Sequence, residues 1–396
     1  MLGGTATRTF ASILIVGTVV VGGYVASRWR RNRSPSPELP SDNVQEIQQP
    51  LIETGDLNIE DLRNYIKERP KVELHCHLNG SVRRSTLQEL LPARSSDLVD
   101  TVHTIEDAFS TFKLVYEAVD SESVLRRIVR ECIEDALADH VIYLELRTTP
   151  RKLSDVSTRR EYVKIIVDEL TRIDLVHNEK PLTSFPKGKI VVRLILTIDR
   201  TQPVSAAEQT VDIALRFPEW VVGIDFAGNP NIGRFQDFSN VFNRARGHGL
   251  STTVHTSEIR DVDNETQAIL DFKPNRMGHF LFANRDQLNF AITNGIAIEL
   301  CPSSNICALY GKFPTNGDLI GHTLLNKLTS SKSCLFSINT DDPGVFGVTL
   351  SDELFSVAKS FKLNKTAVED IIVASAAHSF LSKHEKDLLV TSITNY

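Results

Sequence analysis

Two histidines one residue apart, His75 and His77, end an apolar run that begins at Val72. In a β-strand, side chains two positions apart point to the same face, so both imidazoles can bind one ion while Cys76 points away. Zn²⁺ and similar metals accept neutral imidazole nitrogen readily. With 11 histidines in 396 residues, about 0.3 such pairs per chain are expected by chance. The pair therefore predicts a metal site only where the rest of the sequence supplies further ligands.

Further polar side chains stand at the ends of other apolar runs. His255 is followed three residues later by Glu258, His279 ends another run, and Asp341 and Asp342 follow a third. Taken singly, a strand histidine is more often part of the core, a carboxylate can start a helix, and Asp-Asp-Pro-Gly can form a turn. Together they predict three histidines and one aspartate that converge and leave an open position for water, as in catalytic zinc sites.

The composition is that of an ordinary globular protein, with 41% hydrophobic and 24% charged residues. The 44 basic and 50 acidic residues give a net charge of −6, which argues against nucleic-acid binding but allows a small anionic substrate. The five cysteines form no C-x-x-C pair, so a disulfide framework, a zinc finger and the cytidine-deaminase signature are unsupported. We therefore expect a reducing compartment. The cysteines are Cys76, Cys132, Cys301, Cys307 and Cys334.

Residues 1–33 differ from the rest of the chain and are predicted to be a hydrophobic anchor or targeting segment. Residues 10–26, from Phe10 to Ala26, are uncharged and mostly apolar, at the short limit of a membrane-spanning helix. The arginines that follow favour a membrane tether with the catalytic domain in the cytoplasm. Mitochondrial targeting and a secretory signal are the alternatives. Residues 34–57, which begin with a Pro-, Ser- and Gln-rich stretch, are predicted to be a flexible linker.

In residues 58–396, short apolar runs alternate with longer amphipathic stretches. Near-continuous apolar runs are typical of strands buried on both faces, and stretches such as 121–138, 159–175 and 206–216 predict helices. Eight such alternations predict an α/β protein with a (β/α)₈ TIM barrel, whose active site lies at the C-terminal ends of the strands. The long interval 79–140 is expected to cover the barrel mouth. The runs are 72–78, 141–146, 190–198, 221–226, 251–255, 276–280, 296–300 and 334–338.

The motifs of this domain resemble those of the adenosine/AMP deaminase superfamily. They are V-E-L-H-C-H-L-N-G-S, G-I-D-F-A-G-N-P, H-T-S-E, R-M-G-H, E-L-C-P-S-S-N and S-I-N-T-D-D-P, in this order from about Pro70 to Phe346. Within the superfamily the chain is most similar to the adenosine deaminase-like branch, whose members act on N6-methyl-AMP. Asn79, Ser257 and the run L-E-L-R-T-T-P-R that ends at Arg151 carry this finer resemblance.

The resemblance implies a role for each matching residue. One Zn²⁺ per chain would be bound by His75, His77, His255 and Asp341. Glu258 would protonate purine N1, while His279, helped by Asp342, would orient and deprotonate the attacking water. Substrate would be bound by His77, Asn79, Thr148, Thr149, Arg151, Asp199, the backbone N–H of Gly228, Glu258 and Asp342. Two positions depart from the family pattern: Phe280 stands where a glycine is usual, and Asn229-Pro230 stands where many relatives have an acidic residue.

We therefore expect zinc-dependent hydrolytic deamination of a 6-aminopurine nucleotide, with N6-methyl-AMP converted to IMP and methylamine. Zinc lowers the pKa of water to about 7, and a protonated Glu258 stabilises the electron density that builds on N1. Arg151 can pair with a phosphate or be a solvated surface residue. The alternatives are an adenosine deaminase, a zinc amidohydrolase for another ring, and an inactive purine-binding or interaction barrel. The enzyme is expected to be a monomer.

Overall fold

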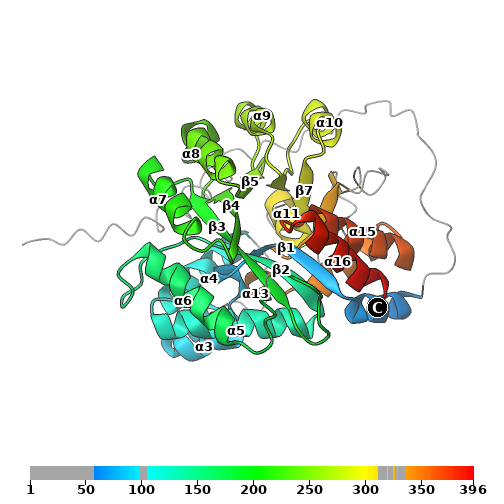
Figure 1. Cartoon of the computed structure of the whole chain (residues 1–396), viewed down its shortest axis with the longest axis horizontal. Helices are drawn as coiled ribbons and strands as arrows, with labels where there is room; N and C mark the ends of the chain where they lie inside the picture. The colour runs from blue at the N-terminus through cyan, green and yellow to red at the C-terminus, as the bar shows by residue number, and fades with distance from the viewer. Residues whose placement is uncertain are drawn as a thin grey trace, which may run out of the picture. The chain divides into compact units, whose positions relative to one another are not determined.

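Within the residues that the structure describes, eight parallel strands form one sheet in which each strand pairs with the next along the sequence (Figure 1). The computed structural model describes residues 58–98, 105–179, 181–310, 319, 324–325, 328 and 335–396. Each strand lies on one of the eight predicted runs, so the (β/α)₈ barrel is confirmed. The strands are β1 (Lys71–His77), β2 (Val141–Thr148), β3 (Val191–Asp199), β4 (Val221–Ala227), β5 (Ser251–Thr256), β6 (Arg276–His279), β7 (Ala297–Leu300) and β8 (Phe336–Ile338).

The barrel closes where the chain after β8 pairs with β1. The Asp341 N–H donates to the backbone oxygen of His75 at 2.9 Å, and the His77 N–H donates to that of Asp341 at 2.8 Å. These two hydrogen bonds place Asp341 directly beside both histidines of β1. The hydrogen bonds that close the barrel therefore also fix the position of Asp341.

Helices alternate with the strands and surround the barrel (Figure 1). Residues with short polar side chains begin several of them: Ser121 accepts from the Val124 N–H, and Thr158 accepts from the Glu161 N–H. The three predicted helices correspond to α5 (Glu122–Ala138), α6 (Arg159–Arg172) and α7 (Val204–Ala214). The longer helices are α2 (Ile59–Glu68), α3 (Arg84–Leu90), α4 (Ile105–Ala118), α5 (Glu122–Ala138), α6 (Arg159–Arg172), α7 (Val204–Ala214), α8 (Phe235–Gly247), α9 (Asp263–Phe272), α10 (Arg285–Thr293), α11 (Pro302–Tyr310), α14 (Leu350–Ser360), α15 (Lys365–His378) and α16 (Lys383–Thr394).

The long interval between β1 and β2 lies over the end of the barrel that carries the candidate residues. It contains η1 (Asn79–Ser81), η2 (Pro92–Asp97) and the helices α3, α4 and α5. Helix α4 contacts η1, which follows β1, and α13 (Pro343–Phe346), which follows the residues after β8. This arrangement agrees with the expectation that the interval covers the barrel mouth.

No helix in the described part of the chain is both long and apolar enough to cross a membrane. The predicted anchor at residues 10–26 and the linker at residues 34–57 lie outside the described residues. The membrane tether, its targeting alternatives and the linker therefore stay predictions.

The barrel interior holds buried charges as well as apolar side chains. Arg276 on β6 is 1% exposed, and it donates from Nε to Glu299 Oε1 at 2.6 Å and from Nη2 to Glu145 Oε2 at 2.5 Å. Its Nη1 donates to the backbone oxygen of His378 at 2.9 Å, and its guanidinium lies 3.5 Å from the ring centroid of Phe380. Buried charges are tolerated only when they are paired. Arg276 therefore joins β2 and β7 to the C-terminal segment.

We expect Arg276→Ala to lower the free energy of unfolding by about 3–5 kcal/mol, because the change removes a buried cation that pairs with two buried carboxylates, Glu145 and Glu299. Arg244→Ala is the matched control. Arg244 also pairs with two carboxylates, Glu208 and Asp212, but at the surface, where such pairs contribute about 0–1 kcal/mol. Urea unfolding of both variants measures the difference. Equal losses would contradict the claim that buried ion pairs of Arg276 stabilise the barrel.

Candidate active site

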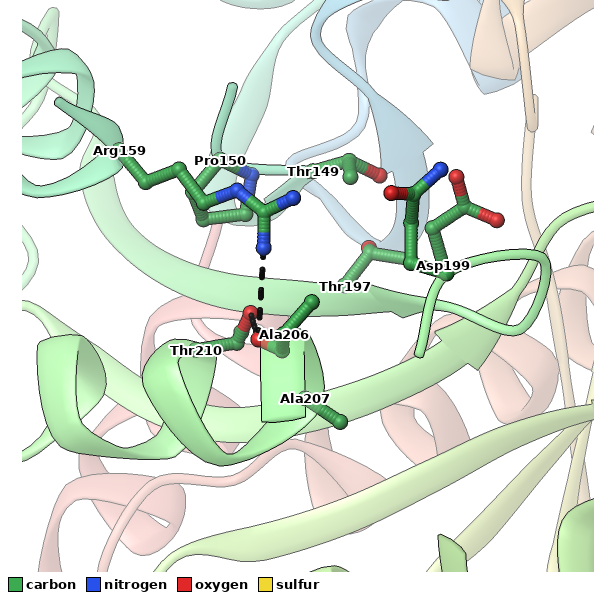
Figure 2. A pocket seen from close by; sticks show the side chains of 9 residues that line it. Thr149, Pro150, Arg159, Thr197, Asp199, Ala206, Ala207 and Thr210 are labelled. Atoms are coloured by element: carbon green, nitrogen blue, oxygen red, sulfur yellow. Dashed lines mark hydrogen bonds between the residues drawn. The ribbon is translucent and has the colours of Figure 1, made fainter. Parts of the chain in front are cut away.

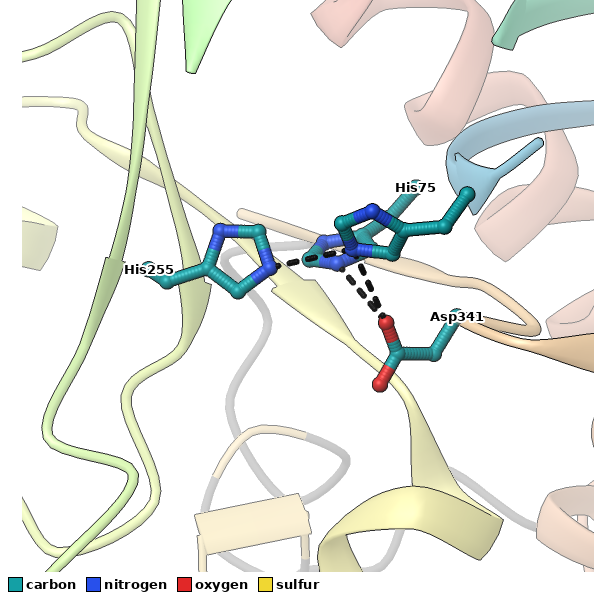
Figure 3. Close-up of side chains that lie close together, drawn as sticks. His75, His255 and Asp341 are labelled. Carbon is teal, nitrogen blue, oxygen red and sulfur yellow. Dashed lines mark hydrogen bonds and ion pairs between the residues drawn. The ribbon is translucent and has the colours of Figure 1, made fainter. Parts of the chain in front are cut away.

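Four side chains converge at the C-terminal ends of β1, β5 and β8 (Figure 3). The Nε2 atom of His77 lies 3.2 Å from Nε2 of His255 and 3.3 Å from Asp341 Oδ1. The same oxygen lies 3.1 Å from Nε2 of His75. All four potential ligand atoms lie within 4.8 Å of one another. The structure therefore brings together all four side chains that the sequence predicts as metal ligands.

Two buried carboxylates orient the rings of His75 and His255 by accepting hydrogen bonds from their Nδ1 atoms. Glu299 Oε2 accepts from His75 Nδ1 at 2.7 Å, and Asp225 Oδ1 accepts from His255 Nδ1 at 2.9 Å. With Nδ1 donating, Nε2 of each ring carries the lone pair and faces the centre of the group. The His75 Nε2 is buried and has no hydrogen-bond partner among the described residues. Because buried polar atoms are normally paired, this nitrogen fits a metal ligand, and the four side chains could hold a metal ion.

Arg147 lies between these two carboxylates. Its Nη2 donates to Glu299 Oε2 at 2.9 Å, and its Nη1 lies 3.5 Å from Asp225 Oδ2. Burial acts to raise the pKa of Glu299, but Arg147 and Arg276 outweigh it and keep that pKa well below its usual range. Burial likewise acts to raise the pKa of Asp225, but His255 and Arg147 hold it below its usual range. Both carboxylates therefore stay anionic and accept hydrogen bonds from the imidazoles.

The adjacent carboxyls Asp341 and Asp342 have opposite surroundings. Burial acts to raise the pKa of Asp341, but the adjacent imidazoles of His75, His77 and His279 outweigh burial and hold that pKa well below its usual range. Burial, followed by the negative charge of Asp341, raises the pKa of Asp342 well above its usual range. A Cβ atom on Gly80 would lie 1.7 Å from Asp342 Oδ1, so glycine is required for this close approach. Asp341 is thus suited to bind a cation, and Asp342 to donate a hydrogen bond.

Glu258 and His279 form a pair beside the four side chains. The His279 Nε2 lies 3.6 Å from Glu258 Oε1 and 4.0 Å from Asp341 Oδ2, while its Nδ1 lies 2.9 Å from Asn305 Oδ1. Burial acts to lower the pKa of His279, but Asp341 and Glu258 outweigh it and raise that pKa. A carboxyl and an imidazole at this spacing can move protons to and from one substrate.

The backbone at these strand ends is strained. Ser257, His279, Phe280 and Asp341 have φ values of 54°, 62°, 55° and 62°. A Cβ atom makes this left-handed region unfavourable, and such residues persist only where the surrounding structure fixes them. They concentrate at functional sites, so the strain agrees with a site at this end of the barrel.

A small cavity lies beside the C-terminal ends of β2 and β3 (Figure 2). Thr149 and Asp199, both predicted to bind substrate, line it together with Arg159 at the start of α6. Thr148 lies outside this lining, and its Oγ1 is 3.0 Å from the hydroxyl of Tyr162. The structure therefore places Thr149 and Asp199 together and turns Thr148 toward α6.

The three other predicted substrate residues have different surroundings. The Oδ1 atom of Asn79 is buried and makes no hydrogen bond within the described residues, so it is available to a ligand. Arg151 donates from Nη2 to the backbone oxygen of Val119, and its guanidinium lies 5.1 Å from the ring centroid of Tyr116. Gly228 has a φ of +110°, which favours glycine. Arg151 thus packs near the end of α4 and is absent from the lining of the cavity in Figure 2.

A comparison with protein families adds to this geometry. Residues 70–396 match the family model described as adenosine deaminase. The chain belongs to the adenosine deaminase family. This match confirms the predicted resemblance and the prediction of a hydrolytic deaminase built on a (β/α)₈ barrel.

Individual relatives are similar over most of their length. The N6-mAMP deaminase of Arabidopsis thaliana is 34% identical over 337 residues, which are 79% of this chain and 92% of that protein. The adenosine deaminase-like protein of Drosophila melanogaster is 31% identical over 350 residues, which are 85% and 98%. The solved ADAL–IMP complex is 30% identical, with a TM-score of 0.74 over 84% of this chain and 98% of that chain. The Arabidopsis ADAL complexed with GMP has the same TM-score, identity and coverage.

The two departures from the family pattern have a physical explanation. Phe280 occupies a left-handed position that glycine adopts without steric cost. Its side chain is fully buried in the apolar core, and this burial offsets the strain. Its N–H donates to the backbone oxygen of Thr256 at 3.0 Å, so the strand end keeps its shape. Asn229 forms a turn in which its Oδ1 accepts from the Asn231 N–H at 3.1 Å.

Four supporting residues were not predicted from the sequence: Asp225, Glu299, Arg147 and Asn305. The first three share one signal, a charged side chain within a nearly apolar strand, as in V-V-G-I-D-F-A and A-I-E-L. A charge at such a position has to be paired inside the barrel, because burying it alone is costly. Asn305 carries no comparable signal, since S-S-N also fits a helix start.

Glu353 on α14 supports the helix that carries Asn305. Its carboxyl oxygens accept from the Ser303 N–H in the first turn of α11, at 3.1 and 3.3 Å. Burial raises the pKa of Glu353 to about 8, although the hydrogen bonds from Ser303 oppose this shift. Glu353 therefore connects α14 to the helix whose Asn305 orients His279.

We expect Glu353 to make the folded protein less stable as pH rises from 4.5 to about 8. In this window the unfolded chain has released the carboxyl proton while folded Glu353 retains it. The free energy of unfolding should then fall by up to about 1.4 kcal/mol per pH unit. Glu353→Gln imitates the neutral form and should remove this contribution. Urea unfolding of both proteins at about pH 5 and about pH 8 tests it, and identical pH slopes would contradict the assignment.

Proposed function

We propose that this protein is a zinc-dependent hydrolase that converts N6-methyl-AMP and water to IMP and methylamine. One observation carries the proposal: the Glu258–His279 pair lies beside the four converging side chains of His75, His77, His255 and Asp341. Relatives named N6-methyl-AMP deaminase, from Arabidopsis and human, support the choice of substrate at 34% and 30% identity.

The donor spacing supports one Zn²⁺ per chain. Around a tetrahedral zinc with bonds of about 2.0–2.1 Å to nitrogen and oxygen, neighbouring donor atoms lie about 3.3 Å apart. The separations His75–Asp341, His77–Asp341 and His77–His255 are 3.1, 3.3 and 3.2 Å. The unpaired Nε2 of His75 supports the same assignment. Zinc bound there supplies a Lewis acid and lowers the pKa of water to about 7.

The chain's own residues move the protons. Nε2 of His279 accepts a proton from the water that attacks purine C6. The Glu258 carboxyl donates its proton to N1, where electron density builds in the transition state. Asp342, whose pKa is raised by burial and by Asp341, donates a hydrogen bond to the base. Protonated His279 then donates its proton to the methylamine nitrogen as the C6–N bond breaks, and the proton of the C6 hydroxyl returns to Glu258, so that IMP and methylamine are released and both side chains regain their starting states.

A nucleotide substrate fits the polar groups around the mouth. The Oδ1 of Asn79 can accept a hydrogen bond from the ribose, and Thr149 and Asp199 line the cavity of Figure 2. Arg151 and Arg159 are two cations that follow β2, and either can pair with a phosphate. The solved ADAL complexes with IMP and GMP are consistent with a 6-oxopurine nucleotide as product. We retain the prediction of a monomer.

We expect Glu258→Gln to lower kcat by about 10²–10⁴, because glutamine cannot protonate N1. The variant should still contain about one zinc per chain, since the four proposed ligands are intact. Asp261→Asn is the matched control: it changes an exposed carboxyl in the same loop and should leave kcat within about twofold. A Glu258→Gln enzyme that keeps its zinc and most of its kcat would contradict the role of Glu258 as the acid.

We expect Arg151→Ala to raise KM for N6-methyl-AMP by about 10–100-fold and to leave adenosine turnover nearly unchanged, because only the nucleotide carries a phosphate. Arg159→Ala, from the cavity of Figure 2, is the matched comparison. If only Arg159→Ala discriminates between the substrates, the phosphate binds in that cavity and the role of Arg151 is wrong. If wild-type enzyme hydrolyses adenosine as well as N6-methyl-AMP, the nucleotide proposal fails and adenosine deaminase is the better description.

A further inference from the structure

A second group of potential metal ligands adjoins the first. It consists of His279 at the end of β6, Cys301 directly after β7 and Asp341 after β8. One ligand atom from each residue lies within 4.8 Å of the others, and all three residues are buried, with exposures of 4%, 0% and 5%. The three residues come from neighbouring strands, so the barrel itself positions them.

We propose that His279, Cys301 and Asp341 form a second, inhibitory site for a thiol-binding divalent cation, with Zn²⁺ as the natural candidate. The inhibitory effect rests on the proposed function, whereas the binding of the cation does not.

The two oxygens of Asp341 point to different groups of ligands. Oδ1 lies 3.1 and 3.3 Å from the Nε2 atoms of His75 and His77, while Oδ2 lies 4.0 Å from Nε2 of His279. Nδ1 of His279 is engaged with Asn305 Oδ1 at 2.9 Å, so Nε2 is the nitrogen that faces Asp341. Asp341 can therefore bridge two cations, as carboxylates do in two-metal sites where the metals lie about 3.5–4 Å apart.

Cys301 differs from an ordinary buried cysteine by its neighbours. Cys307, on helix α11, packs in an apolar cluster with Ala108, Val345 and Phe346. Cys301 belongs to neither of the apolar clusters formed by the described residues, although none of its surface is exposed. It faces an imidazole and a carboxylate instead. A thiolate beside a nitrogen and an oxygen donor favours zinc over magnesium or calcium.

Binding requires only a small contraction of the group. With zinc–nitrogen and zinc–sulfur distances of about 2.0 and 2.3 Å, tetrahedral donors lie about 3.5 Å apart. The present separations, 4.0 Å for the imidazole–carboxylate pair and at most 4.8 Å for the others, are about 0.5–1.3 Å longer than this. The Cys301 thiol releases its proton to solvent as the sulfur–metal bond forms, so each cation bound liberates one proton.

A cation at this site would block the proposed chemistry. It would occupy Nε2 of His279, the atom that accepts the proton from the attacking water. It would also place a positive charge beside Glu258, whose Oε1 lies 3.6 Å from the same nitrogen. One equivalent of zinc should therefore activate the enzyme, and a second equivalent should inhibit it.

Cobalt titration of the metal-free, full-length chain tests the binding site without measuring activity. The first site contains no sulfur, so the first equivalent of Co²⁺ should give no thiolate-to-cobalt charge-transfer absorption. The second equivalent should produce this absorption in the near ultraviolet and release one proton. Cys301→Ser should abolish the absorption, and the matched control Cys307→Ser should retain it. A wild-type protein that shows no such absorption with two equivalents would overturn the proposal.

Zinc titration during N6-methyl-AMP turnover tests the inhibition, with each variant compared with its own activity at one equivalent. Wild-type enzyme and Cys307→Ser should lose activity as a second equivalent binds. Cys301→Ser should need at least about tenfold more zinc, because even the loss of an outer-shell partner costs about 10–100-fold in metal affinity. Equal zinc sensitivity of Cys301→Ser and wild type would refute the site. Cobalt–thiolate absorption in a protein that has no deaminase activity would instead refute the proposed function and leave the second site standing.

Discussion

The negative charge of Glu299, buried in the centre of the barrel, is the constraint on which the rest of the site depends. Its two oxygens accept hydrogen bonds from His75, Thr253, Arg147 and Arg276. A carboxylate without exposed surface is tolerated only when such partners replace water. The same hydrogen bonds that neutralise this charge also set the orientation of His75. The stability of the barrel and the geometry of the proposed metal site therefore have a common origin.

The strain at the strand ends is understandable from this network. Left-handed conformations at non-glycine residues cost on the order of 1–3 kcal/mol each, and four of them occur next to the site. The ion pairs of Arg147 and Arg276 hold the strands beneath them in a fixed register. These fixed strands let His279 and Asp341 keep unfavourable backbone angles while their side chains lie at the site.

The sequence predicted the barrel and the convergence of His75, His77, His255 and Asp341, because both depend on local patterns. Each apolar run became a strand, and polar residues that ended the runs met at one end of the barrel, as the topology of parallel strands requires. Substrate residues were harder to place, since their direction depends on rotamers and neighbours. Thr148 forms a hydrogen bond with Tyr162, and Arg151 donates to the backbone oxygen of Val119. Residue spacing along the sequence does not predict either contact. Asp225 and Glu299 interrupt apolar strands, and the sequence does not reveal the imidazoles and the arginines that balance their charges.

The place of Asp341 in the fold has a consequence for how the protein would bind the proposed metal. Its backbone hydrogen bonds to β1 join a residue near the end of the domain to residues near its beginning. Such long-range contacts slow folding, because the loop-closure entropy of the chain between them has to be overcome before they form. A chain still emerging from the ribosome, or one truncated before β8, carries the histidines of β1 and β5 without the carboxylate that completes the site. Tight binding of the proposed metal would thus require the finished barrel, and metal content would report whether β1 and the chain after β8 have paired.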